Sequence, residues 1–578
     1  MTAFDLVIRA GTVVDGNGGP PRTADVAIAD GTIADVGRGL GRGRREVDAD
    51  GALVTPGFVD IHTHYDGQAS WDQRLLPSSW HGVTTAVMGN CGVGFAPVTA
   101  GHRQRLIDLM EGIEDIPGTA LHAGLRWDWE SFDDYLRALA ARPHDIDFAA
   151  QVPHAALRVH VMGERALAGE PATPDDVAAM AGLARAGVEA GALGFTTSRT
   201  LNHRSITGEL TPTYDADVAE LAGIAAALGA AGRGVLQLVA DFLDVEADLE
   251  VILAMARASG RPVSVSLAQF PFKPDAYREV LSGLAAANNA GLVVRAQVAA
   301  RAVGLLMGLQ CTLHPFMANP VWRGIAGLPV AEQARTMRDP VFKAAMLGAQ
   351  TDARNRNLIG GRLIHKYELM YELTDPPEYE PDPGDSIAAR AARDGRTGPD
   401  LVYDILTGDD GRAMVYVVSA NYVSGNLDAV RDMLAHPCTL PGLSDGGAHV
   451  GSISDASFPT TLLAYWARNR GSDRFPVEFI VQRQARDTAW AVGLADRGVL
   501  APGYRADVNV IDHGRLGLRR PEMRFDLPGG GRRLLQRAEG YLHTFVRGQE
   551  TYTQGEPTDA LPGRLIRGAQ PAPGLLSE

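Results

Sequence analysis

Short apolar runs alternate with longer, alanine-rich amphipathic stretches over most of the chain. The apolar runs predict strands, and they lie at 53–61, 83–88, 147–153, 192–197, 234–240, 262–268, 291–298 and 439–444. Three clear helical stretches lie at 175–190, 216–230 and 246–259. About eight strand–helix alternations predict an α/β fold, with a parallel sheet closed into a (β/α)8 TIM-type barrel over residues 56–499. A doubly wound sheet is the alternative, but no Gly-x-Gly-x-x-Gly turn follows the first strand.

The two ends of the chain have a different, strand-and-turn pattern. Residues 4–50 alternate apolar and polar positions in short pieces separated by Asp-Gly and Asn-Gly pairs, which is typical of β-hairpins. The same alternation returns at 506–512 and 542–548. We therefore expect one small β-sandwich domain that is built from residues 1–55 and 500–555.

Two further segments depart from the strand–helix rhythm. Residues 318–412 contain a proline-rich, acidic stretch with helical pieces around it. A long insertion in a barrel typically covers the catalytic face, so we expect this one to lie over the barrel mouth. Residues 556–578 are rich in proline and glycine. We expect them to form an irregular C-terminal arm, with a neighbouring subunit as one surface within its reach.

His62 and His64 form the only His-x-His pair of the chain, and they stand where the first strand of the predicted barrel ends. Alternate residues of a strand point to the same face, so both imidazoles project in one direction. Two imidazoles directed together at a strand end form half of a divalent-metal site. Two exposed histidines can also co-occur by chance, but the apolar strand before them and the nearby Asp60 favour metal binding.

Other predicted strand ends carry further reactive groups. Cys91 follows the second strand among glycines, His154 closes the third, and Asp445 follows the last. In a (β/α)8 barrel these ends converge on one mouth, where active sites lie. A cation held there lowers the pKa of a bound water towards 7 and polarises a carbonyl. Asp445 could then act as a general base towards that water and later protonate a leaving amine.

Composition narrows the class of protein. The chain has 578 residues, 45% of them hydrophobic and 21% charged, and a net charge of −15. This balance is typical of globular proteins and argues against a nucleic-acid partner. No apolar run reaches the ~18 residues of a membrane span, and the first residues lack the pattern of a signal peptide. Three cysteines cannot build a disulfide framework, so we expect a cytoplasmic protein without a membrane partner. A homo-oligomer is the default expectation.

Six motifs give the chain a resemblance to a known family. They are Pro-Gly-Phe-Val-Asp-Ile-His-Thr-His-Tyr-Asp at 56–66, Gly-Val-Thr-Thr at 82–85, Gly-Asn-Cys-Gly at 89–92, Gly-Ala-Leu-Gly-Phe at 191–195, Ser-Asp-Gly at 444–446 and Gly-Tyr-Arg-Ala-Asp at 503–507. With these motifs the chain resembles the amidohydrolase superfamily, and within it the N-acyl-D-amino-acid deacylase (D-aminoacylase) branch, over nearly its whole length. The resemblance implies a barrel flanked by a small β-domain and zinc-dependent hydrolysis of an amide C–N bond. It implies that His62, His64 and Cys91 are metal ligands and that Asp445 is the catalytic acid/base.

The chain departs from the family pattern on two strands. The family's metal-binding histidines of the fifth and sixth strands align with Gln237 and Leu267, and its substrate-binding lysine aligns with Gln269. Leucine cannot bind zinc, and an amide oxygen is a weak neutral donor. We therefore expect a single ion on His62, His64 and Asp445, with Cys91 close enough to join. A thiolate ligand favours Zn2+.

Several polar residues near the predicted strand ends are candidates for substrate binding. They are His154, Arg199, His203, Gln237, Ser266, Arg295 and His449. Each has an ordinary alternative, because most arginines are solvated and many histidines only form hydrogen bonds in a core. In the same way Cys91 could be a small buried residue and Asp445 a helix cap.

These observations predict a metal-dependent amidohydrolase that cleaves a C–N bond of a small amide. An N-acyl amino acid is the substrate nearest to the family chemistry, and loss of the lysine leaves a cyclic amide as an alternative. A second hypothesis is a binding or assembly protein on a barrel that no longer hydrolyses anything. A lyase or isomerase that uses the metal is a third.

Overall fold

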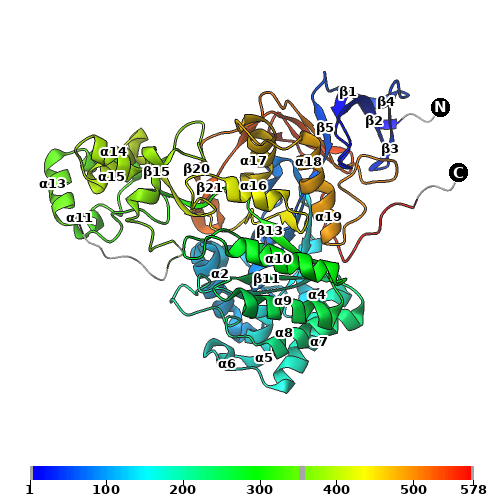
Figure 1. Cartoon of the computed structure of the whole chain (residues 1–578), viewed down its shortest axis with the longest axis horizontal. Helices are drawn as coiled ribbons and strands as arrows, with labels where there is room; N and C mark the ends of the chain where they lie inside the picture. The colour runs from blue at the N-terminus through cyan, green and yellow to red at the C-terminus, as the bar shows by residue number, and fades with distance from the viewer. Residues whose placement is uncertain (1–3, 351–357, 359, 575–578) are drawn as a thin grey trace.

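The computed structural model describes residues 4–350, 358 and 360–574, and it has a mixed α/β fold (Figure 1). Parallel strands form two neighbouring sheets. The first has the order β6 (Phe58–Asp60), β7 (Val83–Met88), β8 (Asp147–Ala150). The second has the order β17 (Thr439–Pro441), β13 (Val294–Val298), β12 (Val263–Leu267), β11 (Val235–Ala240), β10 (Gly194–Arg199), β9 (Val152–Pro153). Each of these strands lies within a predicted strand or extends at most two residues beyond it, and β8 and β9 divide the one predicted at 147–153, so the mixed α/β prediction is confirmed.

Two seams separate these sheets in the described part of the chain. At one seam β8 ends at Ala150 and β9 begins at Val152, and the Leu193 amide donates to the Ala150 carbonyl at 2.9 Å. At the other, the Asp445 amide donates to the carbonyl of His62 at 3.1 Å. The described residues thus show two open sheets linked by a few backbone hydrogen bonds, among them the His64 amide to the Gly446 carbonyl at 2.7 Å, and the closed barrel stays a prediction.

Helices cover one face of the larger sheet. They are α7 (Pro174–Ala190), α8 (Val218–Ala231), α9 (Val245–Ser259) and α10 (Ala276–Asn289); in Figure 1 the first three lie below β11 and α10 lies just above it. Their ends carry strong signals: Thr173 and Asp176 form a capping box at the start of α7, and Gly191 ends it in the left-handed region. Leu236 and Val265 of the sheet pack with these helices in one buried core.

The opposite face of the same sheet is polar. The Gln237 amide donates to Ser266 Oγ at 3.4 Å, and the Gln297 amide donates to Ser264 Oγ at 2.9 Å. Buried amides need such partners, because leaving one unsatisfied costs about 1–3 kcal/mol. The side of the sheet that faces away from the helices is therefore a hydrogen-bonded layer that can hold polar chemistry.

Both ends of the chain contribute to a further sheet, as predicted. Within the described residues it has nine strands in the order β25-β24-β23-β18-β5-β1-β2-β3, with β4 paired to β1. Their bounds are β1 Phe4–Val13, β2 Arg22–Ala29, β3 Thr32–Gly37, β4 Gly43–Asp48, β5 Leu53–Pro56, β18 Val508–Ile511, β23 Tyr541–Val546, β24 Gln549–Thr553 and β25 Glu556–Pro557. The predicted domain limits of 1–55 and 500–555 stay a prediction.

The prediction of a single strand at 53–61 is wrong, because the chain passes from one sheet to another at Gly57. β5 pairs with β1 and β18 in the nine-stranded sheet, whereas β6 pairs with β7. The Gly57 amide donates to the Asp507 carbonyl at 2.8 Å, and a Cβ at this position would lie 2.2 Å from Thr84 Oγ1. The close approach of two sheets thus requires a glycine where the apolar run alone indicates continuity.

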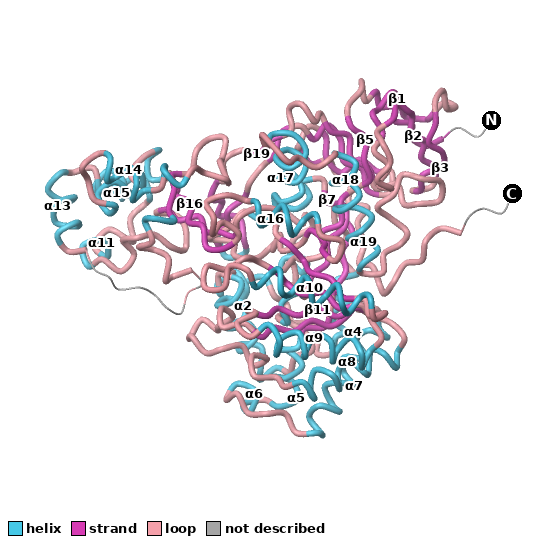
Figure 2. The backbone as a smooth tube through the Cα atoms, in the orientation of Figure 1, coloured by secondary structure: helices cyan, strands magenta, loops and turns pink. Residues whose placement is uncertain are grey.

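A separate lobe stands at one end of the molecule (Figures 1 and 2). It contains an antiparallel sheet of β14 (Val303–Gly308), β16 (Met414–Ala420) and β15 (Met370–Glu372). Its helices are α11 (Pro320–Arg323), α12 (Val330–Met337), α13 (Pro340–Gly348), α14 (Ile387–Arg393) and α15 (Gly398–Leu406). The lobe encloses a hydrophobic core of its own. It therefore extends beyond the predicted insertion 318–412 on both sides, and part of that range, 351–357 and 359, lies outside the described residues.

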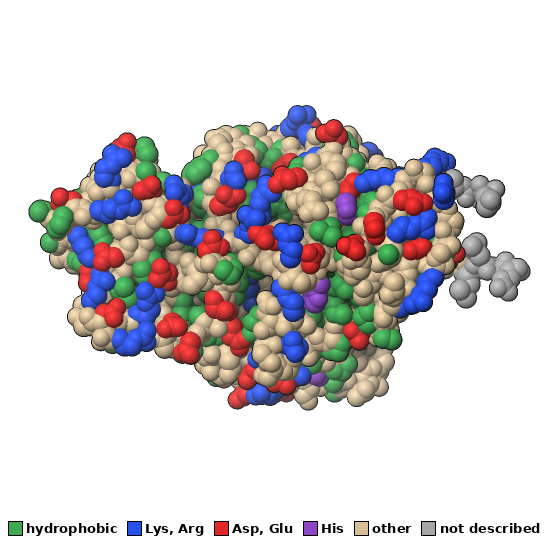
Figure 3. All heavy atoms as spheres, turned by 90° about the horizontal axis from the view of Figure 1, so that it is seen from above, with side chains coloured by type: hydrophobic (Ala, Val, Ile, Leu, Met, Phe, Trp, Pro, Cys, Tyr) green, Lys and Arg blue, Asp and Glu red, His purple; other side chains and the backbone are tan. Residues whose placement is uncertain are grey.

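The segment that follows β25 runs along its own chain. The Ile566 amide donates to the Phe148 carbonyl at 2.7 Å, and the Gln570 amide donates to the Gly493 carbonyl at 2.8 Å. Among the described residues no helix is both long and apolar enough to cross a membrane. On the face drawn in Figure 3, basic and acidic side chains are interspersed. A cytoplasmic location stays a prediction from the cysteine content.

Candidate metal centre

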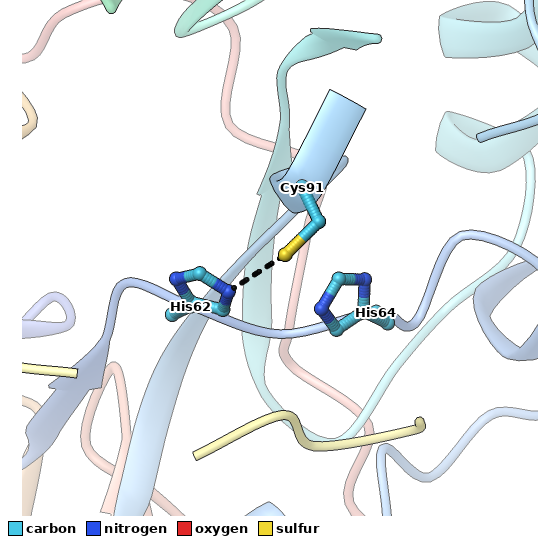
Figure 4. Close-up of side chains that lie close together, drawn as sticks. All are labelled: His62, His64 and Cys91. Carbon is cyan, nitrogen blue, oxygen red and sulfur yellow. Dashed lines mark hydrogen bonds between the residues drawn. The ribbon is translucent and has the colours of Figure 1, made fainter. Parts of the chain in front are cut away.

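Three side chains meet at the carboxyl ends of β6 and β7 (Figure 4). His62 and His64 follow β6, and Cys91 lies in the short turn Asn90–Gly92 after β7. One ligand atom from each residue lies within 4.8 Å of the others, and the His62 Nε2 to Cys91 Sγ distance is 3.3 Å. All three residues are buried, with His62 and His64 each only 1% exposed. The strand-end histidines and the glycine-flanked cysteine are thus brought together as the sequence predicts.

Asp445 completes the group from the last strand end. Its Oδ1 lies 3.4 Å from Nε2 of His62 and 3.6 Å from Nε2 of His64. Its backbone has a φ of 50°, a left-handed conformation that aspartate tolerates better than most residues. The side chain is 23% exposed, so it is the part of the cluster that solvent can reach.

These atoms fit a divalent metal ion. In a tetrahedral site with Zn–N of about 2.0–2.1 Å and Zn–S of about 2.3 Å, neighbouring ligand atoms lie about 3.4–3.6 Å apart. The three distances of 3.3, 3.4 and 3.6 Å in the cluster match these edges. Both ring nitrogens of His64 are also buried without a hydrogen-bond partner among the described residues. Such an unsatisfied donor set is expected where an ion belongs.

The other ring nitrogens of the two histidines face acceptors that the sequence did not reveal. Nδ1 of His62 lies 2.7 Å from Oε1 of Gln297, and Nδ1 of His64 lies 3.3 Å from Oε1 of Glu114. Metal-binding histidines usually donate their second N–H to such a group, which fixes the tautomer and the ring orientation. Glu114 ends α2 (Arg103–Glu114), far from any predicted strand end, and no local motif distinguishes it from other helical acids.

Burial and neighbouring charges set the protonation of the cluster. Burial lowers the pKa of His62 to about 4, so its imidazole is neutral, as a ligand must be. Burial also raises the pKa of the Cys91 thiol to about 12 and that of Glu114 to about 7. For Asp445 burial opposes ionisation, but the nearby imidazoles of His64, His62 and His449 leave the pKa below its ordinary value. Asp445 is therefore a carboxylate at neutral pH.

The fifth and sixth strands bring no imidazole to the cluster. Gln237 uses its side-chain oxygen to accept the Cys91 amide at 3.2 Å, which supports the left-handed turn at Cys91 with its φ of 57°. Leu267 packs in the core that the helices share, and Ser266 occupies the polar face beside Gln237. Leu267, which the sequence aligns with a ligand position, thus faces the helices, and the side chain beside Gln237 is that of Ser266.

Two predicted histidines lie beside the cluster. His203 is buried, and its Nδ1 lies 2.7 Å from Ser198 Oγ. Burial first, and then the charges of His449, His64 and His62, lower the pKa of His203 to about 3. Nε2 of His449 lies 3.5 Å from Glu114 Oε2, so one carboxylate touches His64 and His449 together. Both histidines therefore lie close to the cluster.

Three other candidates point elsewhere. His154 is buried beneath the helices, where it contacts Thr197 at 2.8 Å and Glu220 of α8 at 2.9 Å. Arg199 donates to the Ala216 carbonyl at 2.6 Å, in the loop before α8. Arg295 lies near the amino end of β13 and lines a cavity at the end of the sheet opposite to the histidine pair.

A family comparison decides the class of the protein. The model of the amidohydrolase family matches residues 45–552, which is most of the chain. The chain belongs to the amidohydrolase family. Within that family it is D-aminoacylase-like, as the motifs predicted.

Two curated relatives of this amidohydrolase match it over nearly its whole length, and a third matches about a third of it. A D-aminoacylase of Alcaligenes xylosoxydans xylosoxydans is 27% identical over 571 residues, covering 97% of each chain. An N-acyl-D-glutamate deacylase of the same organism is 29% identical over 572 residues, covering 98% of this chain and 96% of the relative. A third, an N-acyl-D-aspartate deacylase, is 36% identical over 194 residues, or 33% of this chain.

Solved structures agree with these relatives. A D-aminoacylase described with a binuclear metal centre, one-metal activation and second-metal attenuation superimposes with a TM-score of 0.66 at 25% identity, covering 98% of this chain and 100% of that one. An N-acyl-D-glutamate deacylase of Bordetella bronchiseptica, complexed with zinc and a phosphonate mimic of the tetrahedral intermediate, gives 0.65 at 25% with the same coverage. The predicted class, a metal-dependent hydrolase of non-peptide C–N bonds, is confirmed, and the alternatives without hydrolysis are not favoured.

Proposed function

We propose that this amidohydrolase cleaves the amide bond of a small N-acyl amino acid or a related amide. The observation that carries the proposal is the meeting of His62, His64, Cys91 and Asp445 at one set of strand ends, with ligand-atom spacings that suit a divalent ion. The deacylases among its relatives support the substrate class.

A single ion, Zn2+, suits the donor set. The thiol of Cys91 is a soft ligand that favours zinc. A second ion would need donors from the fifth and sixth strands, where Gln237 already supports the Cys91 turn and Ser266 offers only a hydroxyl. The centre would then be simpler than the binuclear centre described for the related D-aminoacylase.

The side chains around the ion have distinct tasks. When bound, the ion supplies Lewis acidity, which activates water and polarises the scissile carbonyl. Asp445, ionised and partly exposed, accepts the proton of the attacking water and returns it to the leaving amine. His203 and His449 lie where they can donate hydrogen bonds to the substrate. Gln297 and Glu114 hold the rings of His62 and His64 in position.

A cyclic amide is a second candidate substrate, and one contact favours it. Gln269, which replaces the family's substrate-binding lysine, is buried, and its side-chain oxygen accepts the amide of Val423 at 3.3 Å. No cation therefore stands at this position to bind a free carboxylate. A substrate without that carboxylate satisfies the altered pocket as well.

We also propose the following architecture around the centre. The two parallel sheets form a single closed (β/α)8 barrel over 56–499, and the small β-domain combines 1–55 with 500–555. The hydrogen bonds across both seams support closure. The lobe that contains the 318–412 insertion borders the mouth, which is supported by the hydrogen bond from Thr312, in the lobe segment just before the insertion, to Asp115 at 2.9 Å.

One experiment tests substrate and metal together. The purified chain is freed of metal with a chelator, reloaded with Zn2+, and assayed on N-acetyl-D-amino acids, their L-enantiomers and five- and six-membered cyclic amides. We expect about one zinc per chain, and hydrolysis of one of these classes that is lost in His62→Ala and Asp445→Asn. Full activity of either variant would overturn the mechanism, and hydrolysis of cyclic amides alone would overturn the first substrate in favour of the second.

A further inference from the structure

A cavity opens at the end of the sheet opposite to the metal centre. It encloses about 410 Å3 and lies at the amino ends of β11, β12, β13 and β17. Val293 and Trp490 stand at its rim and are 45% and 44% exposed. Its inner end is lined by Gln151 and Gln297, so it reaches into the polar layer of the barrel. A volume of this size is in the range of small-molecule sites.

The cavity concentrates positive charge in a chain whose net charge is −15. Arg295, Arg483 and Arg486 line it, and Asp487 is the one acid among the described residues that do so. Asp487 is already paired, 3.1 Å from Arg486 and 3.6 Å from Arg483. One carboxylate therefore faces three guanidinium groups, which leaves two of the three positive charges uncompensated.

Arg295 is the residue without a partner. Among the residues that the structure describes, none forms a hydrogen bond or an ion pair with its guanidinium. Arg483 close by is buried, and its Nε also lacks an acceptor. Burial, and the positive charge of Arg295 with it, lower the pKa of Arg483. Arginines held together in this way repel each other unless an anion lies between them.

The segment that carries Arg483 and Arg486 adds a second irregularity. Residues Arg483–Asp487 form a π-helical turn between α18 (Val477–Gln482) and α19 (Thr488–Ala491). Such turns are rare and frequently occur at functional sites. The amino-terminal end of a barrel ordinarily serves stability, so a charged cavity there is unusual.

We propose that this cavity binds a small organic anion, a carboxylate attached to an apolar or aromatic group. The carboxylate would pair with the free guanidinium of Arg295, in the positive field of Arg483 and Arg486, which also line the cavity. The apolar part would lie against Trp490, Val293 and Pro262 at the rim.

The site is connected to the metal centre by two hydrogen bonds. Ser264 lines the cavity, and its Oγ accepts a hydrogen bond from Nε2 of Gln297 at 2.9 Å. Oε1 of the same Gln297 amide lies 2.7 Å from Nδ1 of His62. An anion that draws the Ser264 hydroxyl proton alters the acceptor that holds Gln297. We therefore expect occupancy of the cavity to change the affinity of the centre for zinc, and zinc to change the affinity for the anion by the same factor.

Benzoate is the probe, and benzamide, its neutral counterpart of the same shape, is the charge control. Calorimetry on the full-length, zinc-loaded protein should show benzoate binding that is at least tenfold weaker in Arg295→Met and unchanged in Arg257→Met, an exposed arginine of α9. His62→Ala should still bind benzoate, with the affinity of the wild-type protein freed of zinc, which separates the cavity from the metal centre. Equal binding of benzoate and benzamide, or equal binding by wild type and Arg295→Met, would overturn the site.

Two further readouts keep the test decisive. Arg295→Met should leave the melting temperature unchanged or raise it without ligand, because it removes a repelling charge, whereas a structural arginine would lower it. A chelator competition with and without benzoate measures zinc affinity. A shift in wild type that disappears in Ser264→Ala supports the connection through Gln297, and identical zinc affinities with benzoate bound would refute it.

Discussion

Nδ1 of His62 lies 2.7 Å from Oε1 of Gln297, which joins the first metal-binding residue to the strand that carries Arg295. The same relationship fixes which nitrogen of His62 faces the centre, because Nε2 remains for Cys91 and Asp445. The orientation of one proposed ligand is thus set by a residue on β13, a strand that adds no residue to the cluster. Glu114 has the equivalent place behind His64.

Glu114→Leu should weaken zinc binding about 10- to 100-fold, the usual effect of removing the group behind a metal-binding histidine. Glu114→Gln keeps an acceptor for Nδ1 of His64 and should recover much of that loss. Zinc affinity is measured by competition with a chromogenic chelator, and Glu111→Gln on the same helix is the control. Wild-type affinity in Glu114→Leu would show that His64 does not depend on this contact.

Cys91→Ser should lower the affinity for Zn2+ at least tenfold but change the affinity for Mn2+ much less. A thiolate is preferred by zinc, whereas manganese binds oxygen ligands equally well. Cys311→Ser, a buried cysteine in the lobe, is the matched control and should leave both affinities unchanged. Parallel losses for the two metals would mean that Cys91 shapes the turn without contacting the ion.

Arg301→Met should destabilise the protein by about 3–5 kcal/mol, because it leaves a buried carboxylate without its partner. Arg301 is fully buried, lies 2.8 Å from Asp455, and stands 3.6 Å from the centre of the Tyr379 ring in the insertion. Urea denaturation followed by fluorescence gives the loss. The double variant Arg301→Met/Asp455→Asn should recover most of it, and a loss equal to that of the single variant would contradict the pairing.

Acid should destabilise the fold through His81 and His314, two buried histidines apart from the metal centre. Burial lowers the pKa of each to about 3 from an ordinary value of 6.5. Between these values the unfolded chain binds the protons and the folded chain does not, so stability is complete above about pH 6.5 and falls as the pH decreases.

The measurement is the urea midpoint at several pH values between 7.5 and 4.5. The slope of unfolding free energy against pH gives the number of protons taken up on unfolding. His81→Gln and His314→Phe should each lower that number by up to about one. The Phe side chain preserves the edge contact with Trp322 that His314 makes at 4.6 Å between ring centres. An unchanged slope in both variants would place the acid-sensitive groups elsewhere.

Local patterns were sufficient to predict the repeating part of the fold. Strand–helix periodicity gave α7, α8 and α9 to within two residues, and a glycine-flanked cysteine and the His-x-His pair indicated three of the four groups in the cluster. These signals are local, because apolar periodicity and caps depend on residues within a few positions of each other.

What the sequence could not provide depends on contacts between distant segments. Gly57 ends one sheet and begins another because Thr84 leaves no room for a side chain. Glu114 stands at the end of α2 and contacts His64 only because the chain folds back on the strand end. Gln297 and His62 are 235 positions apart in the sequence. The site-facing role of Ser266, in place of Leu267, follows from the register of β12 against β11.

The passage from β5 to β6 has a consequence for how the protein is made. Pro56 of β5 is paired with Val508 of β18. β18 pairs with β23, and β23 pairs with β24, so the strand before the His62 segment is anchored by the last portion of the chain. During synthesis the histidine pair emerges early, but its support arrives only after residue 553. A ribosome-bound chain arrested at residue 500 should therefore capture zinc poorly, and the finished enzyme should acquire its metal after release.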